Sequence, residues 1–205
     1  MTTNSCRIVG TMLTLAFCEA FVAPVLAMDP ICNQLKVATA VLKTKPFHLY
    51  MTATSGFGNA KMEKAAGQLG MGGTKESEEI STGTAIYVMT GGKWIDMQTN
   101  FASMEEDKDA DPDTKKAMED SRCQALPDEV IDNQPALVYL QSVPALGIET
   151  KLWISKATHL PVRADVTNDQ GSMKQITVSR YEYSGVAAPA NAMTMKDMIK
   201  SRGGH

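Results

Sequence analysis

The residue types that most often carry acid–base or metal chemistry are scattered in this sequence. Its three histidines are His48, His159 and His205, and they fall on a predicted strand, a predicted turn and the C-terminal residues. None stands in an HExxH or comparable frame, and the chain has no GxSxG elbow to expose a nucleophilic serine. A lone histidine without a partner seldom catalyses a reaction. We therefore predict no catalytic residues, no cofactor and no enzymatic activity.

Four aspartates at alternate positions have the spacing of the first calcium ligands in an EF-hand loop: Asp107, Asp109, Asp111 and Asp113. The frame fails at two later positions. Pro112 replaces the glycine that the loop requires, and Met118 stands where the bidentate glutamate should be. Carboxylates before a helix also interact favourably with the helix dipole. We therefore interpret the segment as a solvated acidic loop that leads into a helix, and we predict no metal site.

Two of the four cysteines, Cys6 and Cys18, lie in an N-terminal segment that we expect to be removed. Cys32 and Cys123 remain, and in an oxidising compartment the simplest state of such a pair is a disulfide. A metal or redox pair is the alternative, but it lacks CxxC spacing and a nearby histidine. We predict a disulfide between Cys32 and Cys123 that closes a long loop.

The N-terminal segment has the pattern of a secretory signal peptide. Arg7 precedes a mostly apolar run that ends at Ala27 with residues suited to signal peptidase. A transmembrane anchor is the alternative, but Glu19 and Pro24 interrupt the run. We predict that residues 1–27 are cleaved on export across the inner membrane and that the mature protein is periplasmic.

The charge and length of the mature chain restrict its class. The formal net charge is −3, and removal of residues 1–27 subtracts one arginine and one glutamate and leaves it unchanged. Without a basic excess, neither nucleic acid nor an anionic membrane surface is indicated as a partner. The length is that of one domain with a sizeable core. We assign residues 28–185 to that domain and residues 186–205 to a loosely held C-terminal tail, and we expect a soluble monomer.

Residues 147–183 show the clearest secondary-structure pattern in the sequence. Apolar and polar side chains alternate in three successive runs, which is typical of half-buried strands. One turn follows at residues 156–159, and a second at residues 168–171 ends in the glycine that a hairpin loop needs. The sequence predicts three consecutive antiparallel strands with one apolar face that another element must cover.

Elements on either side extend this pattern. A helix start at Asp29-Pro30 is followed by apolar residues at helical spacing to about Lys43, and a second helix start occurs at Asp111. Residues 56–73 are glycine-rich and predict a long loop. Further predicted strands cover residues 47–53, 76–81 (a polar edge), 84–90, 93–97, 129–132 and 136–143, with a turn at 133–134. The expected fold is α+β: a curved antiparallel sheet, an open half-barrel, with helices covering its concave face.

Several short motifs resemble the periplasmic lipoprotein carriers of the LolA/LolB type and their relatives, which include lipid-carrying exported lipoproteins and envelope-stress sensor domains. The motifs are Trp94-Ile95-Asp96, Leu152-Trp153-Ile154, Leu160-Pro161-Val162-Arg163, the Gly171 hairpin and Tyr181-Glu182-Tyr183. The predicted signal peptide, the mature length and the helix-first order agree with this resemblance, which covers most of the mature chain. It implies an unclosed half-barrel whose concave side holds acyl chains beneath a helical lid.

Apolar residues on the predicted strand faces are the candidates for contact with a hydrophobic ligand. They are Phe47, Leu49, Met51, Ile86, Val88, Leu152, Ile154, Ile176 and Val178, with Trp94 and Tyr139 as aromatic edges. Fourteen methionines in the chain favour an adaptable apolar surface. The alternative is that these side chains pack beneath the helices as a core, because alternation does not distinguish a filled core from a cavity.

These observations give two expectations for function. The first is a non-enzymatic periplasmic carrier or binding protein that holds a lipid, an acyl chain or the lipid moiety of an acylated protein between sheet and helices. The second is an envelope interaction or stress-sensing module whose core is filled and which acts through a protein partner. A co-purifying lipid distinguishes the first expectation from the second.

Overall fold

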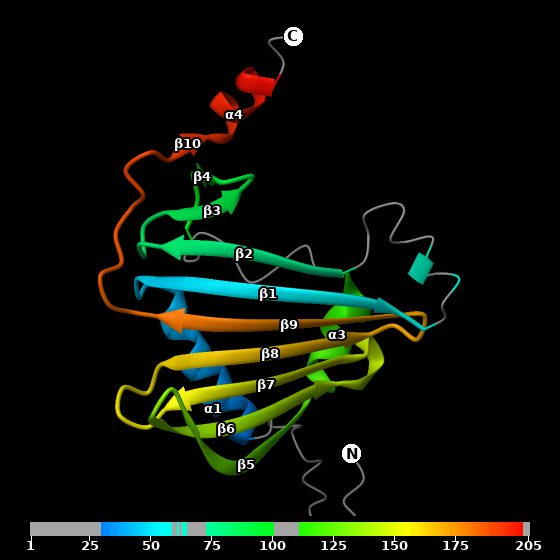
Figure 1. Cartoon of the computed structure of the whole chain (residues 1–205). Helices are drawn as coiled ribbons and strands as arrows, with labels where there is room; N and C mark the ends of the chain where they lie inside the picture. The colour runs from blue at the N-terminus through cyan, green and yellow to red at the C-terminus, as the bar shows by residue number, and fades with distance from the viewer. Residues whose placement is uncertain (1–29, 59–60, 62, 65–72, 101–110, 203–205) are drawn as a thin grey trace, which may run out of the picture.

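A single open sheet of ten strands dominates the computed structural model, which describes residues 30–58, 61, 63–64, 73–100 and 111–202 (Figure 1). The strand order is β10-β4-β3-β2-β1-β9-β8-β7-β6-β5. Neighbouring strands are antiparallel except β10 and β4, which are parallel. The strand bounds are β1 (Phe47–Phe57), β2 (Gly73–Ser81), β3 (Ile86–Thr90), β4 (Lys93–Asp96), β5 (Arg122–Ile131), β6 (Gln134–Val143), β7 (Ile148–Ser155), β8 (Pro161–Asp169), β9 (Met173–Glu182) and β10 (Met193–Thr194).

Helices accompany the sheet mainly on one side. Their bounds are α1 (Pro30–Ala40) with the 3-10 turn η1 (Val41–Lys43), α3 (Pro112–Glu119), the 3-10 turn η2 (Pro144–Leu146) and α4 (Met195–Arg202). α1 crosses behind the strands from β9 to β5, and α3 lies at their right-hand ends in the view of Figure 1. The sheet is open, because its edge strands β10 and β5 are not neighbours in the strand order. This architecture confirms the predicted α+β fold.

One of the two predicted helix starts, at Asp111, lies within the described residues. Asp111 is the N-cap of α3, and its carboxylate accepts a hydrogen bond from the N–H of Thr114 at 3.3 Å. Pro112 occupies the first helical position. A backbone N–H at that position has no partner within the helix, so the N–H that proline lacks costs no hydrogen bond. The predicted helix start at Asp111 is therefore confirmed, whereas Asp29 lies outside the described residues.

Other sequence predictions also concern residues that the structure does not describe. The predicted signal peptide, most of the glycine-rich segment, residues 101–110 and His205 are among them. Within the described ranges, no helix has the length and apolar character needed to cross a membrane.

Strand β5 begins at Arg122, well before the strand predicted at residues 129–132. Pro127 and its polar neighbours conceal the alternating pattern in the sequence. Because β5 is an edge strand, a proline can occur there without depriving a neighbouring strand of a hydrogen bond. The pairing register with β6 shifts between Leu126 and Glu129, so a β-bulge accommodates the proline.

The β5–β6 hairpin turns at Asp132 and Asn133, so the predicted turn at residues 133–134 is displaced by one position. Both residues have positive φ, 49° and 63°. This is the backbone conformation that a type I′ two-residue loop requires. Asp and Asn adopt it more readily than other residues with a Cβ, and Gln134 consequently starts β6.

Alternation divides the sheet into two faces, each with its own apolar cluster. The face that α1 covers, called the α1 face below, has the buried cluster Cys32, Leu35, Cys123, Tyr139, Leu152, Ile154 and Ala164. The opposite face, called the outer face, has a smaller cluster of Ala136, Val138 and Trp153, against which Leu126, Ile131 and Val162 pack. The sheet therefore has two apolar surfaces, one on each face, and both are candidate ligand-binding sites. The residues that cover each surface distinguish a binding face from a structural one.

Trp153 organises the outer-face cluster through its ring and its indole N–H. Lys151 Nζ lies 4.6 Å and Arg163 Cζ 4.9 Å from the ring centroid, both within cation–π range. The indole N–H donates to Glu129 at 2.9 Å, and Lys151 donates to the other carboxylate oxygen at 2.8 Å. The hydrogen bonds from Lys151 and Trp153 lower the pKa of Glu129. The polar edge of this cluster is thus satisfied by the protein itself, which is typical of a structural role.

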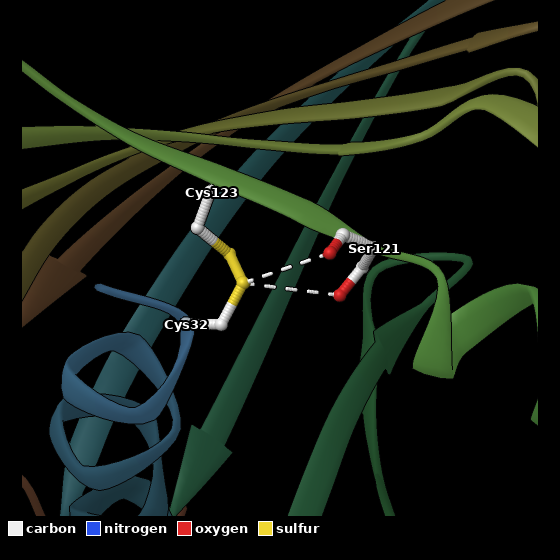
Figure 2. The surroundings of a disulfide bond; sticks show 3 residues. All are labelled: Cys32, Ser121 and Cys123. Carbon is white, nitrogen blue, oxygen red and sulfur yellow. Dashed lines mark hydrogen bonds between the residues drawn. A yellow bond between two sulfur atoms is a disulfide. The ribbon is translucent and has the colours of Figure 1, made fainter. Parts of the chain in front are cut away.

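A disulfide between Cys32 and Cys123 ties α1 to β5, as the sequence predicts (Figure 2). The two Cα atoms are 5.2 Å apart. Ser121 lies beside the bridge, and its hydroxyl and carbonyl oxygens are each 3.9 Å from Sγ of Cys32. Since a disulfide sulfur carries no proton, only the Ser121 hydroxyl can donate across this contact. The bridge therefore fixes the helix over the α1 face.

The C-terminal residues return to the other edge of the sheet (Figure 1). β10 pairs with β4, with Met193 opposite Ile95, and α4 follows. Thr194 accepts the N–H of Asp197 at 3.2 Å and donates its hydroxyl to the Asp197 carboxylate at 2.6 Å, so its side chain caps the first turn of α4. The bond from the Thr194 hydroxyl lowers the pKa of Asp197. The structure thus adds a strand and a helix to a segment expected only as a loosely held tail.

Candidate ligand-binding face

Cross-strand partners share a face, so the register identifies the residues of the α1 face. One row crosses the sheet from β2 to β6 through Ser77, Met51, Ser179, Ala164, Leu152 and Tyr139. A neighbouring row runs through Val88, Glu79, Leu49 and Tyr181. The α1 face therefore continues from the region beneath α1 onto strands β1–β4.

The register places most of the predicted ligand residues on the α1 face: Phe47, Leu49, Met51, Ile86, Val88, Tyr139, Leu152 and Ile154. Trp94, Ile176 and Val178 lie on the outer face, since Trp94 pairs with Met89 and Val178 with Asp165. In β9 the α1 face is supplied instead by the alternate residues Thr177, Ser179 and Tyr181. Contact of any of these residues with a ligand remains a prediction.

Two residues of the α1 face, Glu79 and Tyr181, are absent from the sequence-based candidates. The polar run 76–81 predicts an edge strand, but β2 lies inside the sheet between β1 and β3. The polar residues are tolerated because alternate ones point to the outer face, where Glu78 bonds His48 Nε2 at 3.1 Å. The signal that identifies Glu79 is its register opposite Leu49, which only the strand pairing supplies.

α1 covers the half of this face that β5–β8 form. Leu35 and Cys32 are buried against these strands, while Val37 on the other side of the helix is 75% exposed. Tyr139 donates its hydroxyl to Gln34 Oε1 at 3.4 Å, so the polar end of this buried ring has a partner. Helix and sheet therefore form two walls with an apolar layer between them.

The apolar surface continues past α1 onto β1, β3 and β4. Phe47, Leu49, Ile86 and Ile95 are 1%, 9%, 3% and 2% exposed. The Phe47 ring packs edge to face against Tyr181, with the centroids 5.7 Å apart, a favourable geometry for aromatic pairs. This second half of the α1 face is thus apolar and sheltered from water.

Side chains in the middle of the α1 face are small. Ala53, Ser77, Ala164 and Ser179 stand on neighbouring strands of its central rows, on either side of Met51. Small side chains keep the surface of the sheet low at this point. The flexible methionine among them can adopt several conformations. The centre of the face therefore consists of small side chains around one adaptable methionine.

Glu79 is a half-buried ionisable group on this surface. Its Oε1 is shielded from water and has no hydrogen-bond partner among the described residues. Burial raises the pKa of Glu79, and burial together with the charge of Glu79 raises the pKa of Tyr181. A carboxyl oxygen that loses its hydration without gaining a partner opposes folding. Such a group is unexpected in a surface that serves only as a core.

We expect Glu79→Gln to stabilise the ligand-free protein at pH 7. A raised pKa means that the folded state holds the proton of Glu79 more tightly than the unfolded chain does. This tighter proton binding contributes fully to the stability of the folded protein below the pKa of glutamate in the unfolded chain, about 4.3. The contribution is lost as the pH rises through the pKa of Glu79 in the folded protein. Urea unfolding should show the variant about 1 kcal/mol more stable at pH 7, after allowance for residual solvent screening, with no difference near pH 4. Glu76→Gln, on the exposed outer face, is the control; an equal gain there would contradict the explanation.

On the outer face, His48, Tyr50, Glu78 and Glu182 form a hydrogen-bonded chain. His48 Nε2 lies 3.1 Å from Glu78 Oε2, His48 Nδ1 lies 3.0 Å from the Tyr50 hydroxyl, and that hydroxyl donates to Glu182 at 3.5 Å. The His48 ring stacks on Tyr50 with centroids 4.1 Å apart. Partial burial, followed by the charges of Glu182 and Glu78, raises the pKa of Tyr50. A phenol with a raised pKa is a poor nucleophile at neutral pH, so this chain is best explained as a surface network that links β1, β2 and β9.

Two further features of the structure do not favour a different site. A polar pocket of about 300 Å³ opens on the outer face near η2, lined in part by Ser142, Glu149, Asp169 and Lys174, and its lining does not suit an apolar chain. Within the described residues, no group of three or more His, Cys, Asp or Glu side chains could hold a metal ion. The α1 face is therefore the candidate site that the geometry favours.

Comparison with known proteins gives distant structural neighbours. No protein-family model matches the chain, and no curated protein matches it. MucB in complex with MucA(peri) is similar, with 14% identity, a TM-score of 0.41 and coverage of 78% of this chain and 57% of that chain. LprF from Mycobacterium bovis has 13% identity and a TM-score of 0.37, with coverage of 78% and 96%. A putative outer membrane lipoprotein-sorting protein domain from Vibrio parahaemolyticus has 10% identity and a TM-score of 0.27, with coverage of 83% and 96%.

The low identities, coverages and TM-scores limit what these structural neighbours indicate about function. The chain spans little more than half the length of the MucB chain that it matches. TM-scores below 0.5 and identities this low define neither a ligand nor a partner for this chain. The function must therefore be argued from the α1 face itself.

Proposed function

We propose that this chain is a non-enzymatic, exported binding protein that holds an acyl chain, a lipid or the lipid moiety of an acylated protein on the α1 face. The observation that carries the proposal is the continuity of this face. Buried apolar residues extend from beneath α1 to β4, with small side chains at the centre. The resemblance of the sequence motifs to periplasmic lipoprotein carriers supports the ligand class and the periplasmic location.

The energetics of such a site favour a long apolar ligand. Each methylene that leaves water contributes about 0.8 kcal/mol, so a chain that lies along several strands can offset the loss of translational freedom on binding. The disulfide holds α1 in place before the ligand arrives, which reduces the ordering that binding requires. A preformed apolar layer therefore needs only a few polar contacts to fix the orientation of its ligand.

Filling the centre of the α1 face should block ligand uptake. Ser77 points to this face opposite Met51, and Glu76 on the same strand points to the outer face opposite Thr52. We expect Ser77→Trp to weaken binding of the neutral fluorescent probe N-phenyl-1-naphthylamine by at least about tenfold, since an indole ring occupies the volume that the probe needs. Glu76→Trp, the matched control, should bind the probe like the unaltered protein. Equal uptake by both variants, with both folded, would place the probe elsewhere and contradict the assignment of the face.

A second candidate function rests on the low exposure of Phe47, Leu49, Ile86 and Ile95. If these side chains fill the interior completely, the protein is an envelope interaction or stress-sensing module that acts through a protein partner. Folded protein that takes up neither the neutral probe nor added acyl chains would favour this second function over the first.

A further inference from the structure

Apolar residues surround Glu79 on the α1 face, and their packing does not require a carboxyl group. On β2 it lies between Leu49 of β1 and Val88 of β3, which are its cross-strand partners on the same face. Ile86 and Phe47, two of the least exposed residues of the protein, lie one row away on these flanking strands. A leucine or valine at this position would extend the apolar surface without interruption.

Glu78, the residue before Glu79, places its carboxyl group on the outer face. Glu78 has a partner, since its Oε2 lies 3.1 Å from His48 Nε2, and its side chain is 41% exposed. Glu79 Oε1 is shielded from water and has no partner within the described part of the chain. A buried acceptor without a donor costs about 1–3 kcal/mol, and more when it is charged. Because no described residue supplies a donor to this oxygen, a bound ligand is a suitable source of one.

The surroundings of Glu79 determine which donor fits. An ionised carboxylate in an apolar layer attracts a cation and repels an anion more strongly than it would in water, because the effective dielectric constant is lower. On β9, beside β1, Tyr181 shares the face, and burial together with the charge of Glu79 raises the pKa of Tyr181. A ligand ammonium group can supply both the missing hydrogen bond and the missing opposite charge.

We propose that Glu79 is the polar anchor of the α1 face and selects apolar-chain ligands that carry an ammonium group over those that end in a carboxylate. This inference rests on the proposed function, because it names the head group that the same site prefers. The ammonium group can belong to a single-chain amine or to the ethanolamine head of a phospholipid, and the two share the N–H donor and the positive charge.

The test compares three ligands of one chain length, dodecylamine, dodecanol and dodecanoate, by displacement of N-phenyl-1-naphthylamine at about pH 8. We expect dodecylamine to bind at least about tenfold more tightly than dodecanoate, with dodecanol between them. Glu79→Gln should remove this order and give three similar affinities, because glutamine keeps the shape but carries no charge. Glu76→Gln, on the outer face, should retain the order and thereby exclude a general effect of the acidic protein surface.

A second arm separates the two sources of the ammonium group. Lysophosphatidylethanolamine can donate an N–H to Glu79, whereas lysophosphatidylcholine of the same chain cannot. A preference for the first that disappears in Glu79→Gln points to a phospholipid head, whereas preference for dodecylamine alone points to a simple amine. An unchanged preference for ammonium ligands in Glu79→Gln overturns the proposal. Equal binding of all ligands to the unaltered protein overturns the anchor but leaves the carrier function, whereas no binding of any ligand overturns the carrier function itself.

Discussion

Replacing both Cys32 and Cys123 with serine lowers the free energy of unfolding by about 4 kcal/mol and weakens ligand uptake. The bridge joins residues separated by 91 positions, and in the chain-entropy model a cross-link of this span restricts the unfolded state by slightly more than that amount. The same bridge holds α1 on β5 (Figure 2). Without it the helix must dock through Leu35 and its neighbours alone.

Urea unfolding of the double variant and of the unaltered protein measures the first effect, and uptake of N-phenyl-1-naphthylamine measures the second. Ser121→Ala is the matched control, since it removes only the weak contact of a hydroxyl with Sγ at 3.9 Å; it should change stability by less than about 0.5 kcal/mol. Equal unfolding midpoints for the double variant and the unaltered protein would show that the bridge does not hold α1.

Trp153→Ala should destabilise the protein by about 3–4 kcal/mol without altering ligand uptake by the folded fraction. Trp153 is 3% exposed and packs against Ala136 and Val138 on the outer face. Its truncation leaves a cavity, which is the main cause of such losses, and it also leaves Glu129 without the indole N–H. Because the α1 face is untouched, the affinity of the folded protein for a hydrophobic probe should be unchanged.

Trp153→Phe separates the parts of this effect. Phenylalanine keeps an aromatic ring beside Lys151 and Arg163 but cannot donate to Glu129, so a smaller loss of about 1–2 kcal/mol is expected. Calorimetry or urea unfolding measures both variants. A loss below about 1 kcal/mol for Trp153→Ala, or a large change in probe affinity, would contradict the division of the sheet into a structural outer face and a binding α1 face.

The strands that the sequence predicts best are those whose pattern is local. In β7, β8 and β9 apolar and polar residues alternate, and Gly171, with a φ of 75°, permits the turn between β8 and β9. The pattern fails where tertiary context decides. Pro127 hides the first half of β5, which only an edge position and a bulge make acceptable.

The sequence predicts apolar strand faces, but it does not predict which residues share the α1 face. Alternation identifies two sets of residues on each strand but does not say which set faces the helix, because that depends on pairing register. In β9 the apolar Ile176 and Val178 take the outer face, while Ser179 and Tyr181 take the α1 face. The sequence does not identify Glu79 for the same reason, since a glutamate in a polar run is ordinarily assigned to solvent.

Native mass spectrometry of the protein, expressed with its own N-terminal segment and purified without detergent, tests whether the α1 face carries a hydrophobic ligand. We expect protein with a discrete additional mass of lipid size, which organic extraction removes and lipid analysis assigns to an acyl-chain compound. Bare protein that also takes up no added amine, alcohol, fatty acid or phospholipid would contradict the claim that the α1 face binds a hydrophobic ligand.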